Sequence, residues 1–339
     1  MQIPQLPAGA RGEIFAQSFE TLSIRSSPHD SITAEKSTRS EFGPLAPFLA
    51  DAAVTDIVVT GSGEVWIDRG RGMERAPVPP LPPAQARQLS VELIALGGRH
   101  IDEANPCVDS RLSEGIRVHA VLPPISPTGP LIAVRIPRAQ GMSLAQLKTH
   151  GMFDDVSALT GLVHRRTNVL VTGAGGTGKT TLLSALLSAA SHSERIVAIE
   201  DVAELRVDHP HFVGLEARQA NLEGAGEIDV ARLVREALRM RPDRLVLGEC
   251  RGAEIRELLA ALNTGHDGGG GTLHANSLED VPSRIEALGA LAGMSAESIA
   301  RQAVSAIGVV LHLERIQGTR RLTQWGRLAL DGRDRLVVA

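Results

Sequence analysis

The sequence predicts an α/β protein built mainly on a mostly parallel, doubly wound sheet. Apolar, β-branched runs alternate with Leu- and Ala-rich runs of helical spacing from about residue 154 onward, as in strands joined by crossover helices. The first of these strands, 167–172, leads into a glycine loop and then into a helical run. Before it, residues 43–138 contain hairpin signals and one long helical run, which predict a smaller domain of mixed helix and strand.

The glycine loop, 173–180, reads GAGGTGKT and fits the pattern G-x-x-x-x-G-K-[ST] between a strand and a helix. Its glycines let backbone N–H groups surround phosphate oxygens, and the helix start adds partial positive charge. Lysine is rare here, since only Lys36, Lys148 and Lys179 are lysines, so a chance match is improbable. We expect ATP here, with Lys179 on the β- and γ-phosphates and Thr180 as a Mg²⁺ ligand. The predicted nucleotide-binding residues of the loop are Gly173, Ala174, Gly175, Gly176, Thr177, Gly178, Lys179, Thr180 and Thr181.

Composition narrows the class of protein. A chain of 339 residues exceeds one typical domain. Its net charge of −4 and its eight Phe and Trp residues argue against a general nucleic-acid coat. The two cysteines, Cys107 and Cys250, have no partner at metal-ligand spacing; they fit a reducing compartment, although a disulfide is possible. Neither an 18-residue apolar run nor a signal-peptide core is present, which predicts a cytosolic protein.

The predicted organisation has four parts: a flexible tail over 1–40, an N-terminal domain over 41–138, a linker over 139–152 and an ATPase domain over 153–339. In the N-terminal domain we expect helices at 44–53 and 84–96, a loop at 69–83, and strands at 56–60, 64–68, 117–122 and 131–136. In the linker and ATPase domain we expect helices at 154–164, 179–190, 229–240 and 253–263 and a pair within 278–306. The expected strands there are 195–199, 212–216, 245–247 and 272–273, with an antiparallel edge formed by 309–315 and 321–328.

Acidic residues follow two of the predicted strands. Glu200 and Asp201 end one, and Glu249 ends another. In open α/β sheets, ligands bind at the carboxyl ends of strands, so these acids face the nucleotide if their strands neighbour the loop strand. One carboxylate then polarises the attacking water, and others hold Mg²⁺ and its water shell. The alternative for each acid is a helix cap or a first-turn residue.

A run of four glycines, 268–271, precedes His274. Glycines in succession cost backbone entropy and pack poorly, so we expect a loop that approaches a ligand or moves. We expect His274, at a strand end, to form a hydrogen bond to phosphate or to transmit the state of the nucleotide to the rest of the protein. The equally weighted alternative is that His274 has only a structural role. Two further predicted strands carry Arg117 and Arg135, for which a solvated strand position is the simpler interpretation.

The chain resembles the type II/IV secretion ATPases, and most closely the CpaF/TadA-type ATPases of tight-adherence pili. Four family motifs occur in the family's order: the Walker A loop (173–180), the Asp box (199–205), the Walker B segment (245–252) and the His box (264–276). N-terminal pieces at 54–57, 108–112, 117–118 and 122–124 also resemble that family. The resemblance covers about residues 43–315. It departs at the four glycines, where many relatives have Ser, Leu or Thr, so a polar coupling role of that turn is in doubt.

The resemblance implies a RecA-like P-loop NTPase core with a smaller α+β, PAS-like N-terminal domain, assembled as a hexameric ring. It implies that Glu249 is the Walker B catalytic carboxylate, that Glu200 with Asp201 supplies the Asp box, Glu200 holding Mg²⁺ through water, and that His274 is the His-box histidine. Arginines of the N-terminal domain then approach the γ-phosphate. These are Arg117 and Arg135, with Arg111 and Arg138 as weaker candidates. In the ATPase domain, Arg218 is another possible nucleotide contact.

The resemblance implies a Mg²⁺-dependent ATPase that powers pilus assembly or protein secretion. Its expected partners are copies of itself and an inner-membrane platform protein, so we expect a cytoplasmic protein bound peripherally at the inner face of the membrane. Nucleic acid is not an expected partner, because no basic run is interleaved with aromatic residues. Two alternatives stay open: a motor for DNA transfer or uptake, and a nucleotide-dependent assembly switch with little turnover.

Overall fold

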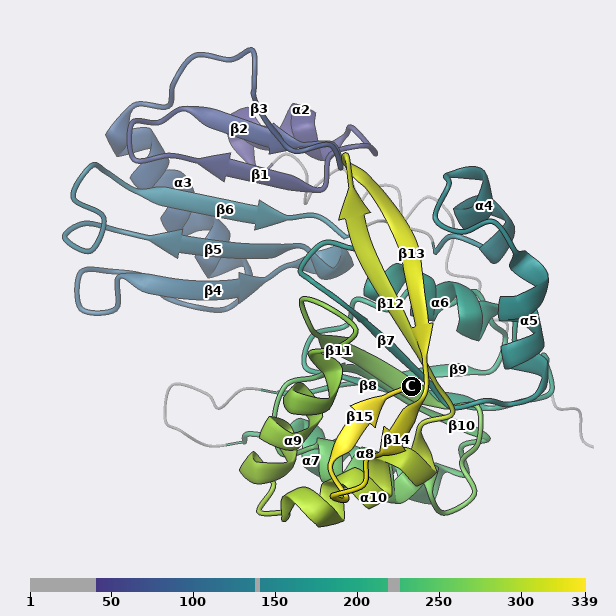
Figure 1. The fold of residues 1–339 in the computed structure, drawn as a ribbon. Helices are drawn as coiled ribbons and strands as arrows, with labels where there is room; N and C mark the ends of the chain where they lie inside the picture. Colours follow the sequence, from purple (N-terminus) through teal and green to yellow (C-terminus); the bar gives the residue numbers. More distant parts are fainter. Residues whose placement is uncertain (1–40, 138–140, 219–225) are drawn as a thin grey trace, which may run out of the picture.

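The computed structural model describes residues 41–137, 141–218 and 226–339 of the chain. Two large sheets organise these residues, and each lies in its own unit (Figure 1). Two short strands near the C-terminus pair as a third, small sheet. We call residues 41–137 the N-terminal unit and residues 153–339 the P-loop unit. The predicted tail over 1–40 and Arg138 lie outside the described residues.

The N-terminal unit is an antiparallel sheet with one long helix on one face. Its six strands follow the order β3-β2-β1-β6-β5-β4. Apolar side chains at alternate strand positions are buried in one cluster with those of the long helix α3, as expected for a sheet with a single covered face. The elements are η1 (Gly43–Leu45), α2 (Ala46–Leu49), β1 (Asp56–Val59), β2 (Val65–Asp68), β3 (Met73–Arg75), α3 (Pro83–Leu96), β4 (Cys107–Arg111), η2 (Ser113–Gly115), β5 (Arg117–Val121) and β6 (Leu131–Arg135).

The expected helices and strands of this unit are present, and two edge strands were missed. The predicted strands 56–60 and 64–68 form the β1–β2 hairpin, with Val59 opposite Val65. Strand β3 lies inside the predicted loop, and all three of its residues are exposed, so no apolar alternation marked it. Strand β4 at the opposite edge alternates exposed with buried residues over only five positions.

The P-loop unit is built on the predicted mostly parallel sheet. The order is β13-β12-β7-β11-β10-β8-β9, and β13 alone runs antiparallel to its neighbour, which confirms the expected antiparallel edge. Two short helices precede the sheet: α4 (Leu144–Thr149), which lies in the predicted linker, and α5 (Val156–His164). The remaining elements are β7 (Val169–Gly173), α6 (Lys179–Ser188), β8 (Ile196–Glu200), β9 (Phe212–Glu216), α7 (Val230–Ala237), η3 (Leu238–Met240), β10 (Arg244–Cys250), α8 (Ile255–Leu262), β11 (Gly270–His274), α9 (Val281–Leu291), α10 (Ala296–Ala306), β12 (Val309–Ile316), β13 (Thr319–Gly326), β14 (Leu328–Leu330) and β15 (Leu336–Val338).

Helices cover both faces of this sheet. Helices α4, α5 and α6 share one apolar cluster with the strands, and α7 to α10 share the other. Successive strand residues belong to opposite clusters: Leu245 and Leu247 pack on one side and Val246 on the other, so the strands read as continuous apolar runs. Among the described residues, no helix is long and apolar enough to cross a membrane.

The four glycines, predicted as a loop that approaches a ligand or moves, instead enter the centre of the sheet. Gly270 and Gly271 begin β11, which is inserted between β7 and β10. A Cβ added at Gly270 would lie 1.9 Å from the Val169 carbonyl oxygen, and one at Gly269 would lie 2.1 Å from that of Leu245. The prediction was wrong because close approach of neighbouring backbones, and not a ligand, requires the missing side chains.

Asn168 fixes the start of this glycine segment. Its Oδ1 accepts hydrogen bonds from the backbone N–H groups of Gly268 and Gly269 at 2.8 and 3.2 Å, and its Nδ2 donates to the Ala306 carbonyl at 2.8 Å. The side chain is 8% exposed. One buried amide, just before β7, therefore joins the segment that enters β11 to the end of α10, the helix that precedes β12.

Replacing Gly270 with Ala tests this account. Gly270 has φ = +142° and its position is blocked by backbone, so we expect the free energy of unfolding to fall by about 2 kcal/mol or more. Gly332→Ala is the matched control, because nothing lies within 4 Å of its added Cβ, and its effect should stay within about 0.5 kcal/mol. Urea unfolding followed by circular dichroism measures both, and equal midpoints for the two variants would contradict the packing argument.

Candidate functional site

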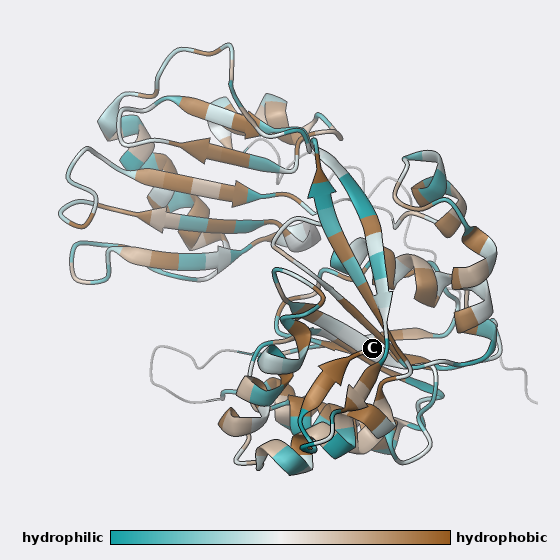
Figure 2. Cartoon of the chain, viewed as in Figure 1, coloured by the Kyte–Doolittle hydropathy of each residue, from teal (hydrophilic) through white to brown (hydrophobic). Residues whose placement is uncertain are grey.

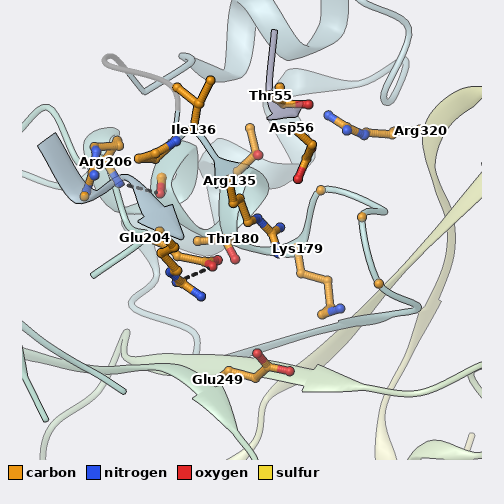
Figure 3. A pocket seen from close by; sticks show the side chains of 18 of the residues that line it. Thr55, Asp56, Arg135, Ile136, Lys179, Thr180, Glu204, Arg206, Glu249 and Arg320 are labelled. Atoms are coloured by element: carbon orange, nitrogen blue, oxygen red, sulfur yellow. Dashed lines mark hydrogen bonds and ion pairs between the residues drawn. The ribbon is translucent and has the colours of Figure 1, made fainter. Parts of the chain in front are cut away.

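A cleft of about 490 Å³ lies between the two units (Figure 3). The glycine loop and the start of α6 form one wall, and the starts of β1 and β5 with the ends of β2 and β6 form the other. Within the described residues, seven basic and four acidic side chains line it, so the cleft favours a polyanion. The charged lining residues are Asp56, Asp68, Arg117, Arg135, Lys179, Glu204, Arg206, Glu249, Arg251, Arg315 and Arg320.

The glycine loop has the backbone conformation that its sequence predicts. Gly176 and Gly178 have φ values of +72° and +97°, in the left-handed region that glycine adopts without steric cost. Lys179 is 8% exposed, and its Nζ donates to the carbonyls of Gly173 and Ala174, both at 2.9 Å. Burial lowers the pKa of Lys179, and the nearby Glu249 partly opposes that shift. The ammonium group is therefore held at the wall of the cleft by the loop's own carbonyls.

Facing the loop, one row of five charged residues crosses the N-terminal sheet. Each member lies directly opposite the next on the neighbouring antiparallel strand, so all five side chains share one face. The order along the row is Asp68, Asp56, Arg135, Arg117 and Arg111. We call these residues the charged row; it lies on the face of the sheet away from α3.

The arginine end of the charged row binds acidic groups that follow β8 and end β9. Arg117 donates to Glu204 at 2.6 Å. Arg111 pairs with Glu216 and also donates to the Asp201 carbonyl at 2.9 Å. Burial lowers the pKa of Arg117, as do the neighbouring arginines, while Glu204 raises it. The two units are therefore held together by opposite charges beside the cleft.

Glu249 reaches the cleft from the end of β10. Strand β11 lies between β10 and β7, so the sequence-based condition that the acid-bearing strands neighbour the loop strand is not met. Glu249 nevertheless lines the cleft opposite Lys179 (Figure 3). Arg251 donates to Glu249 at 2.7 Å and lies 4.0 Å from Asp201. The hydrogen bond to Glu249 raises the pKa of Arg251.

Glu200 lies behind the cleft and is not among its lining residues. It is 5% exposed, and its Oε1 accepts the backbone N–H groups of Glu204 and Leu205 at 2.9 and 3.0 Å. Burial raises the pKa of this carboxyl group, against these two hydrogen bonds. A Cβ at Gly248 would lie 2.5 Å from the Glu200 side chain, so the glycine before Glu249 makes room for it. Glu200 thus shapes the turn that presents Glu204.

The other sequence-predicted residues divide between the cleft and its surroundings. His274 lines the cleft at the end of β11, together with Gly175, Gly176, Thr180 and Thr181. Gly173, Ala174 and Thr177 shape the loop from behind, and Asp201 is not among the lining residues. Arg218 donates to the Gly226 carbonyl at 2.7 Å and is likewise not a lining residue.

Sequence reasoning missed several lining residues. Asp56 and Asp68 lie at the ends of strands, and Glu204 and Arg206 lie in the turn after β8. Arg315 and Arg320 lie in β12 and β13, outside the predicted motifs. A signal for Glu204 was available, because it follows the β8 acids within the same motif. Arg315 and Arg320 carried none, because nothing local reveals that their hairpin reaches the cleft.

The role of Glu200 leads to a stability prediction. Glu200→Ala leaves two backbone N–H groups without their acceptor, so we expect the free energy of unfolding to fall by about 1–3 kcal/mol. Glu200→Gln keeps an oxygen acceptor in the same place and should lose less than half as much. Thermal unfolding of the two variants compares these losses; equal losses would show that the acceptor oxygen is not what stabilises the turn.

Comparison with known proteins identifies the family. A family model described as "Type II/IV secretion system protein" matches residues 38–316. A putative conjugal transfer protein of Mycobacterium tuberculosis is 46% identical over 291 residues, 83% of each chain. The type IV secretion system protein VirB11 of Brucella suis is 30% identical over 263 residues, 70% of this chain and 73% of the relative. The crystal structure of the pilus retraction motor PilT with bound ADP has the same fold, with a TM-score of 0.57 and 20% identity, covering 83% of this chain and 80% of that one. The chain therefore belongs to the type II/IV secretion system protein family.

Proposed function

We propose that the protein is an ATP-hydrolysing ring motor that drives pilus assembly or protein secretion. The observation that carries this proposal is the shared cleft, in which Lys179 of the glycine loop faces Arg117 and Arg135 of the charged row. A phosphate-binding loop alone binds nucleotide. Arginines on the opposite wall add the charge that a transferring phosphoryl group requires.

The roles follow from position in the cleft. Backbone N–H groups of the loop and Lys179 hold the phosphates. Arg117 and Arg135 approach the γ-phosphate, and Arg117 exchanges its bond to Glu204 for one to the nucleotide. Glu249 accepts the proton of the attacking water, and Arg251 sets the orientation of its carboxylate through the 2.7 Å contact. His274, at the end of β11 between β7 and β10, contacts the γ-phosphate.

Magnesium fits the residues present. Mg²⁺ prefers oxygen ligands and is usually bound by one or two protein groups together with substrate phosphates and water. The Thr180 hydroxyl lines the cleft and would supply one such oxygen, with phosphate oxygens and water supplying the others, whereas Glu200 is committed to backbone N–H groups. The ion supplies charge neutralisation on the β- and γ-phosphates.

For the assembly we propose a homo-hexamer at the cytoplasmic face of the inner membrane, peripherally bound to a platform protein. This part rests on the family and on the motif resemblance to the CpaF/TadA-type ATPases of tight-adherence pili. A hexameric ring converts closure of six clefts into motion of a bound partner, which suits the assembly of a pilus or the export of a protein.

A second candidate is a motor for DNA transfer. It is favoured by a specific observation, because the 46%-identical relative carries the name of a putative conjugal transfer protein. The composition favours the first candidate. The chain has a net charge of −4, and it has only eight Phe and Trp residues, so there are few rings on which bases can stack.

Two substitutions separate binding from hydrolysis. Lys179→Ala should weaken ATP binding by about 1.5–3 kcal/mol or more, since it loses a charge-assisted phosphate contact. Glu249→Gln should bind ATP normally but turn over at least about 10²-fold more slowly. Calorimetric titration and a phosphate-release assay measure the two effects. Unchanged ATP affinity in Lys179→Ala would contradict the proposed nucleotide site. Near-normal turnover in Glu249→Gln would show that another carboxylate is the base.

The DNA alternative has its own test. A DNA motor neutralises several phosphates, so its DNA binding falls steeply between about 50 and 200 mM salt. We expect the ATPase rate to be insensitive to single- and double-stranded DNA at both salt concentrations. A salt-sensitive stimulation of several-fold would favour the conjugal motor over the secretion motor.

A further inference from the structure

The β12–β13 hairpin connects the P-loop unit to the N-terminal unit. It leaves the edge of the second sheet and reaches the turn after β2 (Figure 1), where Arg315 donates to the Gly70 carbonyl at 2.8 Å. Its turn residues, Gln317 and Gly318, both have positive φ, as expected for a tight two-residue hairpin turn. The half of the hairpin that protrudes toward the N-terminal unit is mostly hydrophilic (Figure 2). Its contact with that unit is therefore polar and not an apolar packing contact.

The position of the hairpin is fixed relative to the glycine loop. Strand β12 pairs in parallel with β7 up to Leu313 opposite Gly173, the first residue of the loop. On the other strand, the backbone N–H of Leu322 donates to the Met152 carbonyl at 2.7 Å. Each strand of the hairpin is therefore bonded to a segment near the glycine loop. The side chains on the face of the hairpin that is turned toward the cleft consequently have a defined position; we call this the inner face.

Arg320 lies on that inner face. It is directly opposite Arg315 across the hairpin, and both line the cleft. The Arg320 Cδ lies 3.4 Å from the Cβ position of Gly178, the residue before Lys179, so its aliphatic part packs on the glycine loop. Figure 3 shows Arg320 near Thr55 and Asp56, on the far side of the cleft from Glu249.

Strand order indicates which end of a nucleotide Arg320 faces. The hairpin flanks β7 on one side, whereas β11 and then β10, which carries Glu249, flank it on the other. The reacting γ-phosphate lies toward Glu249. The hairpin therefore faces the end of the nucleotide that remains in ADP after hydrolysis. The charged group at that end is the α-phosphate.

We propose that Arg320 is a nucleotide-binding residue that contacts the α-phosphate, and that Arg315 positions it by anchoring the hairpin to the N-terminal unit. This inference rests on the proposed nucleotide site. Guanidinium groups bind phosphate oxygens through short, charge-assisted hydrogen bonds. Arg320 binds substrate and product alike, so it contributes affinity and not rate.

The test compares Arg320→Ala with Arg321→Ala in the full chain. Arg321 follows on the same strand, lies opposite Glu314 and 3.7 Å from Asp154, and does not line the cleft, so the control removes the same charge outside the site. We expect Arg320→Ala to weaken ADP binding about tenfold or more, the loss of one charge-assisted contact. Its kcat at saturating ATP and its affinity for inorganic pyrophosphate should stay within about twofold of the wild-type values, and Arg321→Ala should match the wild type throughout.

Three results would overturn the inference. Equal ADP affinity in Arg320→Ala and Arg321→Ala would show that Arg320 makes no contact with the nucleotide. A loss of pyrophosphate affinity as large as the loss of ADP affinity would place Arg320 at the β-phosphate. A loss of kcat at saturating ATP places it at the reacting group instead. Circular dichroism and the urea midpoint confirm folding, and Arg320→Lys, which keeps the charge, should retain part of the affinity. Failure of the wild type to bind ADP would instead refute the nucleotide site itself.

Discussion

The attraction between the charged row and the acidic groups beside β8 and β9 is the interaction on which the cleft depends. Arg117 binds Glu204, and Arg111 binds Glu216 and the Asp201 carbonyl. These contacts place the arginine end of the N-terminal sheet over the glycine loop. Partial burial removes water from around Arg117, which strengthens its attraction to any anion that enters the cleft.

Buried groups and glycines behind the cleft also support this arrangement. Glu204 faces Arg117 because the buried Glu200 carboxylate holds the turn that carries it, and Gly248 leaves room for Glu200. The glycines at the start of β11 allow that strand between β7 and β10. That insertion sets how far Glu249 lies from Lys179. The geometry of the site is thus determined as much by close backbone packing as by its charged residues.

Most elements of the fold and the centre of the site were predictable because their signals are local. The glycine loop carries its backbone requirement and its lysine within eight residues, and the alternation after it determines a parallel sheet. The charged row was not predictable, because its five members come from five strands and meet only through cross-strand register. Glu200 illustrates the same limit: its sequence position fits a metal ligand, but its partners are backbone groups revealed only by the folded turn. The glycine run was misinterpreted because strand order decides whether its neighbour is a ligand or another strand.

The central claim is that hydrolysis requires both walls of the cleft, and single-turnover hydrolysis by Arg117→Ala tests it most directly. The account predicts a rate lower by about 10³-fold with ADP affinity within a few-fold of the wild-type value. Arg111→Ala is the matched control, because Arg111 belongs to the same charged row and binds the P-loop unit but does not line the cleft. It loses only contacts between the two units, so its rate should fall far less than that of Arg117→Ala. A wild-type rate in Arg117→Ala, or equal losses in both variants, would contradict the claim that Arg117 acts on the phosphate and not only in holding the two units together.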